Sequence, residues 1–252
     1  MQIDLTGRVI LVTGASRGIG RTIASHLHAA GATVAVHYHR SSEAADSLVS
    51  ELGPNAAAFA ADLAGSESCA GLFGAVLQEF GHLDVLINNA GVAHLIAEDA
   101  PVKEWSELWA HTMNVNARAT ALLCRLAVRH FSERSGGRII NVASRAAFRG
   151  DTAEYAAYAA SKGAVVALTR SIARAYGKQG VAAFVIAPGF VRTDMAQDSI
   201  DAYGEQFVLD NLALNQLTEP QDVAPIVTLL ASGLADHATG ATIDINAGSY
   251  VH

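Results

Sequence analysis

A short apolar segment that leads directly into a glycine-rich turn constrains the fold of this chain more than any other feature. Residues 8–13 read Arg-Val-Ile-Leu-Val-Thr, an apolar and β-branched run that predicts a strand buried on both faces. The turn at residues 14–20 holds three glycines, and residues 21–30 then predict a helix. A strand, a glycine turn and a helix in this order present backbone N–H groups and a helix N-terminus to a phosphate group.

Short apolar segments alternate with helical patterns along the rest of the chain. We predict strands at residues 8–13, 33–38, 56–61, 83–88, 137–143, 181–186 and 242–246. We predict helices at residues 21–30, 42–52, 66–80, 101–132 in two pieces, 155–176 and 219–232. Such alternation calls for a parallel sheet with helices on both faces. The predicted fold is therefore a single-domain, Rossmann-like, doubly wound α/β sheet of about seven parallel strands, which spans residues 1–252.

The second predicted strand ends in the polar residues Tyr38-His39-Arg40-Ser41, and residues 33–42 contain no acidic side chain. In doubly wound sheets, ligands bind beyond the carboxyl ends of the strands, and NAD sites hold a carboxylate here for the ribose 2′-OH. Arg40 and Ser41 can instead donate hydrogen bonds to a 2′-phosphate. The sequence therefore predicts a dinucleotide site that prefers NADP(H), with a solvated loop as the alternative.

Tyr158 and Lys162 lie four residues apart in a predicted helix and therefore share one of its faces. A free tyrosine has a pKa of roughly 10, and lowering it by about 3 units requires about 4 kcal/mol. A unit charge about 4 Å away supplies that order of energy at an effective dielectric constant of about 20. We therefore expect Lys162 to lower the pKa of Tyr158, so that the phenol can exchange a proton with an alcohol or carbonyl oxygen. The pair alone is a weak signal, because an aromatic residue and a lysine often share an ordinary helix.

Charge and composition argue against several classes of function. The net charge of -7 is unlike that of a general nucleic-acid-binding protein. No apolar run approaches the roughly 20 residues that span a bilayer, and residues 1–5 lack the pattern of a signal peptide. The two cysteines, Cys69 and Cys124, do not make a disulfide framework. We expect a cytoplasmic protein without a membrane partner, a nucleic-acid partner or a metal site.

Taken together, the motifs resemble those of the short-chain dehydrogenase/reductase family over essentially the whole chain. The matching segments are Thr13-Gly-Ala-Ser-Arg-Gly-Ile-Gly20, Asn88-Asn-Ala-Gly91, Ser144, Tyr158-x-x-x-Lys162 and Pro188-Gly189. Each motif is weak by itself, but their order and spacing are highly specific. The closest resemblance is to the 3-oxoacyl-carrier-protein reductase type. It implies an NADP(H)-dependent oxidoreductase that interconverts a carbonyl and a secondary alcohol, and it implies a homotetramer.

The resemblance also implies a catalytic tetrad, which consists of Asn116, Ser144, Tyr158 and Lys162. Asn116 matches the family pattern better than Asn114, because it lies seven residues after Trp109. By resemblance, Ser144 holds the substrate carbonyl and Tyr158 exchanges the proton. Lys162 lowers the pKa of Tyr158 and reaches the nicotinamide ribose, and Asn116 holds a water that links Lys162 to solvent.

Residues that we expect to bind the dinucleotide follow several of the predicted strands. They are Gly14, Ser16, Arg17, Gly18, Ile19, Gly20, Tyr38, His39, Arg40, Ser41, Asp62, Leu63, Asn89, Ala90, Gly91, Tyr158, Lys162, Pro188, Gly189, Val191 and Thr193. This set combines the residues at the strand ends with those that the resemblance implies. NADP(H) is the expected cofactor.

The irregular segment at about residues 190–217 is the predicted substrate lid. It mixes apolar with acidic side chains, namely Phe190, Met195, Phe207, Val208 and Leu209 with Asp194, Asp198 and Asp201. This mixture favours a largely apolar carbonyl substrate. A second group, Arg125, Arg129, Arg174 and Lys178, could attract an acidic carrier protein that bears the substrate, although a solvated basic face is an equal alternative.

Three other functions remain as alternatives. The segment His37-Tyr-His-Arg-Ser41 is similar to the cofactor loop of pteridine reductases, although Ser144 is the ordinary carbonyl-reducing residue. A sugar or alcohol dehydrogenase would carry the same motifs. A dinucleotide-sensing regulator is the non-enzymatic reading, and the presence of all four tetrad residues argues against it.

Overall fold

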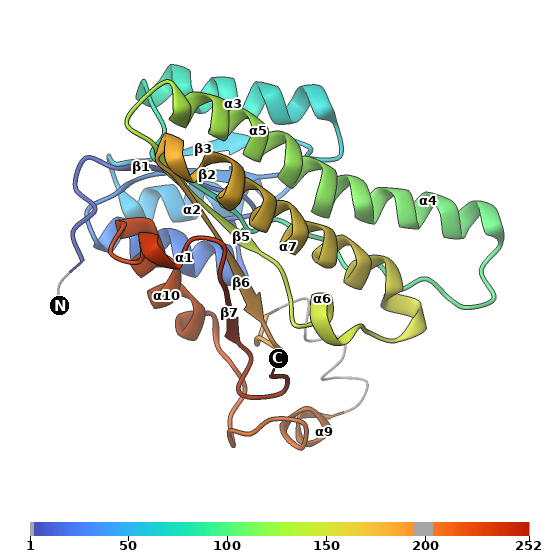
Figure 1. Cartoon of the computed structure of the whole chain (residues 1–252). Coiled ribbons are helices and arrows are strands. Elements are labelled where there is room, and N and C mark those ends of the chain that lie inside the picture. Colours follow the sequence, from blue (N-terminus) through green and yellow to red (C-terminus); the bar gives the residue numbers. More distant parts are fainter. Residues whose placement is uncertain (1–2, 194–203, 252) are drawn as a thin grey trace.

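The computed structural model describes residues 3–193 and 204–251, in which helices cover both faces of one sheet (Figure 1). The sheet has seven strands, all parallel, in the order β3-β2-β1-β4-β5-β6-β7. The strands are β1 (Val9–Val12), β2 (Thr33–Tyr38), β3 (Ala56–Ala60), β4 (Val85–Asn88), β5 (Gly137–Val142), β6 (Val181–Pro188) and β7 (Thr242–Ile245). The predicted doubly wound fold is confirmed, and each strand ends within two residues of its predicted bounds.

The helices form two layers, and the strands supply apolar side chains to both. One face is covered by α1 (Gly18–Ala29), α2 (Ser42–Leu52) and α10 (Pro220–Ser232), the other by α3 (Ser66–Phe80), α5 (Ala119–Ser132) and α7 (Ala156–Tyr176). In β1, Ile10 and Val12 pack toward the first layer, whereas Val9 and Leu11 pack toward the second. Because side chains alternate along a strand, a sheet buried on both faces requires the near-continuous apolar runs that the sequence shows.

The helix predicted in two pieces at residues 101–132 is joined by a π-helical turn. α4 (Val102–Met113) passes through the turn Asn114–Arg118 into α5 without leaving the helical backbone region. A π turn widens the helix by one residue and changes the direction in which its side chains point. It leaves Asn116 only 1 % exposed, so the asparagine chosen from the sequence faces the interior.

Three local features differ from the sequence prediction. α1 begins at Gly18, three residues before the predicted start, so two of the turn glycines lie in its first turn. Two short helices, α6 (Ala146–Arg149) and α9 (Glu205–Leu209), were not predicted, and α9 lies in the segment expected to be irregular.

Four lid residues named above, Asp194, Met195, Asp198 and Asp201, lie outside the described residues.

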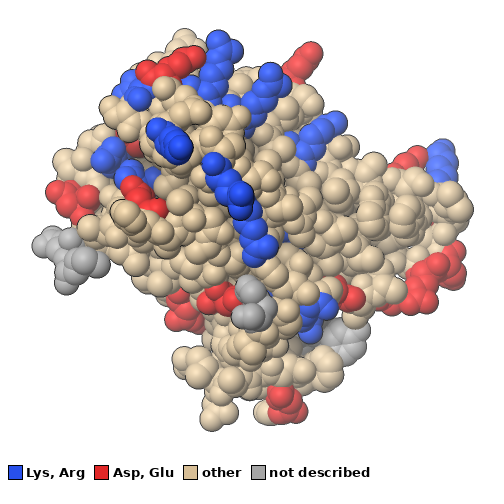
Figure 2. All heavy atoms as spheres, in the orientation of Figure 1, with Lys and Arg blue, Asp and Glu red and all other residues tan. Residues whose placement is uncertain are grey.

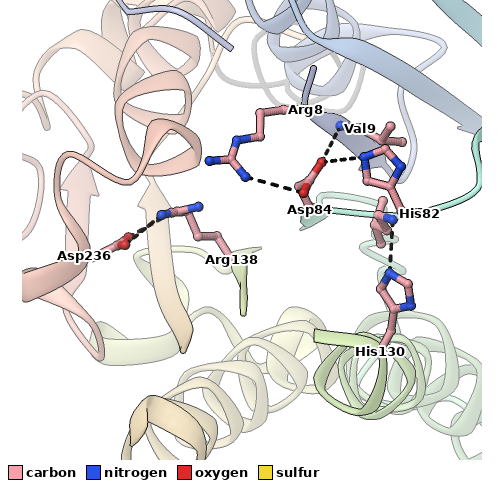
Figure 3. Close-up of polar contacts among 8 residues, drawn as sticks. Arg8, Val9, His82, Asp84, His130, Arg138 and Asp236 are labelled. Atoms are coloured by element: carbon pink, nitrogen blue, oxygen red, sulfur yellow. Dashed lines mark hydrogen bonds and ion pairs between the residues drawn. The ribbon is translucent and has the colours of Figure 1, made fainter. Parts of the chain in front are cut away.

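Polar side chains at the amino ends of the strands bond to one another (Figure 3). Asp84 accepts a hydrogen bond of 2.8 Å from the Val9 N–H and pairs with His82 at 3.2 Å. Arg138 donates twice to Asp236, at 2.9 and 2.8 Å. Polar groups at the amino ends of the strands therefore contact one another. The carboxyl ends of the strands, on the opposite side of the sheet, carry the residues predicted to bind ligands.

Candidate active site

Three of the four predicted catalytic side chains meet where β5 ends and α7 begins. Tyr158 and Lys162 lie one turn apart in α7, and the Lys162 Nζ is 5.7 Å from the centroid of the Tyr158 ring. Ser144 follows β5, and its side chain shares a hydrogen bond with Tyr158. The Lys162 Nζ is buried and donates a 2.9 Å hydrogen bond to the Val142 carbonyl.

The pKa values of this pair differ from the sequence expectation. Burial raises the pKa of Tyr158 above its ordinary value, the hydrogen bond with Ser144 lowers it, and the charge of Asp151 raises it. Burial also lowers the pKa of Lys162 to about 8. The expectation that Lys162 lowers the pKa of Tyr158 is thus wrong for the protein by itself, because burial is the largest cause of the raised pKa and the charge of Lys162 is not among the causes.

Asn116 joins the same cluster from the π turn. Its amide group donates to the Val92 carbonyl at 2.8 Å and to the Ser161 hydroxyl at 2.9 Å, and its Oδ1 accepts from the Val92 N–H at 2.8 Å. A Cβ added to Gly91 would lie 3.3 Å from the Asn116 Oδ1 and 3.2 Å from the Lys162 Nζ. Asn116 therefore lies beside Lys162 and fixes the loop after β4, while its predicted water contact stays a prediction.

The Asn88-Asn-Ala-Gly91 motif supports the glycine turn from the neighbouring strand. The Asn89 side chain donates to the carbonyls of Thr13 at 2.9 Å and Gly14 at 3.1 Å. The Thr13 hydroxyl accepts from the N–H groups of Asn89 and Ala90, each at 3.0 Å. The Asn89 side chain was predicted to bind the cofactor. Its amide N–H groups instead hold the backbone of the glycine turn, because β1 and β4 are adjacent in the sheet.

His37 supports the same turn from the other side, and the sequence analysis missed this role. The Gly14 N–H donates to the His37 Nδ1 at 3.0 Å, and the Ala15 N–H donates to the His37 carbonyl at 2.8 Å. The His37 Nε2 lies 3.1 Å from the Ala61 carbonyl oxygen. Burial lowers the pKa of His37 to about 4. A lone histidine within the apolar β2 was the available signal.

The remaining predicted cofactor residues lie along the carboxyl edge, although two of them turn inward. Arg40 is exposed after β2, and the His39 Nε2 lies 3.9 Å from the Asp62 carboxylate after β3. A Cβ on Gly18 would lie 3.3 Å from Thr193, so the segment after β6 reaches the glycine turn. The side chains of Leu63 and Val191 are buried in the core, and only their backbones can face a ligand.

The turn also fits the phosphates of a dinucleotide. The first N–H groups of α1 have no acceptor within the helix, and its first turn carries no acidic side chain. A negatively charged group is therefore favoured at this helix terminus. The turn follows β1 at the point where the strand order reverses, because the chain leads from β1 to β2 on one side and from β4 to β5 on the other. Doubly wound sheets bind ligands in the crevice at this point.

Within residues 3–193 and 204–251, no three His, Cys, Asp or Glu side chains lie close enough together to hold a metal ion. The helices of this same part of the chain include none that is both long and apolar enough to cross a membrane. Both cysteines are buried, and burial raises the pKa of the Cys124 thiol to about 12, which makes it a poor nucleophile.

Sequence similarity to known proteins extends over nearly the whole chain. Residues 8–204 match the family model described as short chain dehydrogenase. The chain is 34% identical to the 3-oxoacyl-(acyl-carrier-protein) reductase FabG of Vibrio cholerae serotype O1 over 249 residues, which cover 99% of this chain and 100% of the relative. Similarity of this extent covers the glycine turn and the tetrad together.

Solved structures agree with this assignment. A short chain dehydrogenase from Burkholderia cenocepacia in complex with NADP has a TM-score of 0.89 and 34% identity, over 97% of this chain and 98% of that one. A 3-ketoacyl-(acyl-carrier-protein) reductase from Brucella melitensis complexed with NADH also has a TM-score of 0.89, with 29% identity over 98% and 100% of the two chains. The chain therefore belongs to the short-chain dehydrogenase family.

Proposed function

We propose that this protein is an NADP(H)-dependent oxidoreductase of the 3-oxoacyl-(acyl-carrier-protein) reductase type, which interconverts a carbonyl and a secondary alcohol. The observation that carries the proposal is the cluster of Ser144, Tyr158, Lys162 and Asn116 at the carboxyl edge of the sheet. This cluster lies on the same edge as the glycine turn, which fits a dinucleotide. The name of the Vibrio cholerae relative supports the proposed reaction.

Each catalytic side chain has a distinct role in this proposal. A bound nicotinamide dinucleotide would supply the hydride in reduction or accept it in oxidation. Ser144 donates a hydrogen bond that holds the substrate oxygen, and Tyr158 transfers the proton. A raised pKa keeps Tyr158 protonated at neutral pH, which suits the reducing direction. Lys162, with a pKa of about 8, is mostly an ammonium group at pH 7 and is held in place by the Val142 carbonyl.

We infer NADP(H) rather than NAD(H) from the end of β2. Residues 39–42, which directly follow this strand, contain no carboxylate to accept a hydrogen bond from a ribose 2′-OH, and Arg40 is exposed there. A 2′-phosphate brings about two negative charges, which a guanidinium can meet. The solved relatives do not decide the matter, because one is complexed with NADP and the other with NADH.

We propose an acyl group carried on an acidic protein as the substrate class. Figure 2 shows Lys and Arg side chains gathered over the region of α5 and α7. The exposed side chains there include Arg125 and Arg129 of α5, Arg174 of α7 and Lys178, which lies in the turn Gly177–Gln179 directly after α7. Arg129 is partly neutralised by Glu133 at 3.4 Å, whereas an acidic carrier would meet the others.

A panel of carbonyl compounds tests the proposed reaction. NADPH oxidation would be followed with β-ketoacyl thioesters, simple ketones, sugars and dihydropterins. We expect the thioesters to be reduced fastest. If small ketones are reduced and thioesters are not, the acyl-reductase assignment fails. Reduction of dihydropterins alone would favour the pteridine reductase reading. Binding of NADPH without any turnover would instead indicate a dinucleotide sensor.

A further inference from the structure

His37 lies inside β2, directly after the buried apolar residues Val34, Ala35 and Val36. Its ring bridges β1 and β3, the two strands that neighbour β2 in the sheet. The side chain is 2 % exposed. The Nδ1 contacts the N–H of Gly14, which follows β1, and the Nε2 contacts the carbonyl of Ala61, which follows β3. One imidazole therefore joins the carboxyl ends of three adjacent strands, β1, β2 and β3.

These two contacts determine where the proton of the ring lies. The Gly14 N–H is a donor, so the Nδ1 that accepts from it carries no proton. The neutral ring then holds its proton on Nε2, where it can donate to the Ala61 carbonyl. Each ring nitrogen is thereby paired with a backbone group of the opposite hydrogen-bonding character.

The same residue sets the direction of the glycine turn. Gly14 has a φ of 62°, and the next N–H, that of Ala15, donates to the His37 carbonyl. The first two N–H groups of the turn are thus directed toward β2. The N–H groups at the start of α1, from Gly18 onward, are the ones that lack an intrahelical acceptor. An anion at the turn would bind these groups.

We propose that His37 is a positioning residue for the cofactor, whose Nδ1 holds the Gly14 N–H and so keeps the glycine turn in the shape that binds the pyrophosphate. The inference rests on the proposed dinucleotide function. It concerns the part that NADPH and NADH have in common, whereas Arg40 concerns only the 2′-phosphate. If the role of His37 were purely structural, losing the contact of either ring nitrogen would lower only the stability of the protein. If His37 positions the cofactor, losing the Nδ1 contact alone weakens cofactor binding, because Nε2 bonds to a group outside the turn.

Two amide variants separate the two nitrogens. His37→Asn places an oxygen near the Nδ1 position, where it can accept from Gly14, but it cannot reach Ala61. His37→Gln extends to the Nε2 position, where it can donate to Ala61, and leaves the Gly14 N–H without an acceptor. His37→Phe keeps a ring and removes both contacts. For each variant, fluorescence titration gives the dissociation constants of NADPH and NADH, and thermal denaturation gives the midpoint of unfolding.

We expect His37→Asn to bind both cofactors within about 3-fold of the unmutated protein. His37→Gln and His37→Phe should each bind both cofactors at least about 10-fold more weakly, because the partly buried Gly14 N–H loses its acceptor. The kcat at saturating cofactor should change by less than about 3-fold in all variants that fold.

Equal weakening in His37→Asn and His37→Gln would overturn the proposal, and so would lower unfolding midpoints with unchanged dissociation constants. If the unmutated protein binds neither dinucleotide, the proposed function itself fails. The two failures are therefore distinguished by the first titration.

Discussion

Arg40 is the side chain that we expect to distinguish NADPH from NADH. It is exposed after β2, and within the described residues its guanidinium makes no hydrogen bond or ion pair. A hydrogen bond to a charged group is worth about 1.5–3 kcal/mol. Arg40→Ala should therefore raise the Michaelis constant for NADPH by roughly 10–100-fold and leave that for NADH almost unchanged.

Steady-state kinetics with both cofactors measure this effect, and Arg134→Ala, at an exposed position in the turn after α5, is the matched control. The control should change neither constant. An equal rise for NADPH and NADH in the Arg40 variant would show that its guanidinium does not contact the 2′-phosphate.

His37 should also make the stability of the protein depend on pH. Its folded pKa of about 4 lies below the ordinary value of 6.5, so its contribution is fully present above pH 6.5 and is lost as the pH falls toward 4. Between pH 7 and pH 5 this loss amounts to about 2 kcal/mol. His39, which lowers the pKa of His37 by its charge, acts in the same direction.

Urea denaturation of the unmutated protein and of His37→Gln at pH 7 and pH 5 measures the contribution. The unmutated protein should lose about 2 kcal/mol more than the variant over this interval. Equal losses would mean that other groups, such as His130, account for the acid sensitivity.

Whether a residue's role could be predicted depended on where its partner lies in the chain. Tyr158 and Lys162 could be paired from the sequence, because the period of one helix brings them together. The roles of His37 and Asn89 could not, because both support the glycine turn from other strands. Which strands neighbour β1 is a property of the sheet order, and the spacing of residues along the chain does not show it.

The first turn of α1 packs so closely on the end of β1 that no side chain fits at Gly20. A Cβ there would lie 2.3 Å from the Gly14 carbonyl oxygen and 2.5 Å from the Asn89 Nδ2. Gly20→Ala should lower the free energy of unfolding by about 1–3 kcal/mol, because the helix must move away from the strand. Chemical denaturation measures this change, and NADPH binding should weaken with it.

Gly71, an exposed glycine within α3, is the matched control. A Cβ there would meet no atom within 4 Å. Gly71→Ala should raise the free energy of unfolding by about 0.5–1 kcal/mol, because alanine favours a helix more than glycine does. If Gly20→Ala is as stable as the unmutated protein, the close approach of α1 and β1 is not required.

The strands could be predicted more closely than the connections between them. A sheet buried on both faces requires short apolar runs, and these runs are visible in the sequence. The π turn at Asn114–Arg118 is not visible, because its residues suit an ordinary helix equally well. The short helices α6 and α9 are held mainly by tertiary contacts. In α9, for example, Glu205 pairs with Arg192 at 2.6 Å.

We expect the protein to form a homotetramer in which residues 105–132 and α7 pair about two-fold axes. In Figure 1, α4 projects beyond the sheet. Its exposed apolar side chains include Val102 and Trp105, and the Trp105 ring stacks on Trp109 with their centroids 4.9 Å apart. Exposed apolar surface of this kind is typical of an interface.

Light scattering at micromolar concentration measures the assembly. A tetramer has about four times the 26.2 kDa mass of one chain. A measured mass near that of one chain would refute the prediction.

The identity of Tyr158 as the proton donor of a carbonyl reductase can be tested by a single comparison of turnover numbers. NADPH-dependent reduction of a 3-oxoacyl thioester would be measured for the unmutated protein, Tyr158→Phe and Tyr155→Phe. Tyr158→Phe keeps the ring beside Lys162 but removes the hydroxyl, so kcat should fall by at least about 100-fold while NADPH binding changes little. Tyr155→Phe, at the start of α7, should be nearly as active as the unmutated protein. A Tyr158→Phe variant that stays active, or a larger loss in Tyr155→Phe, would contradict the proposed active site.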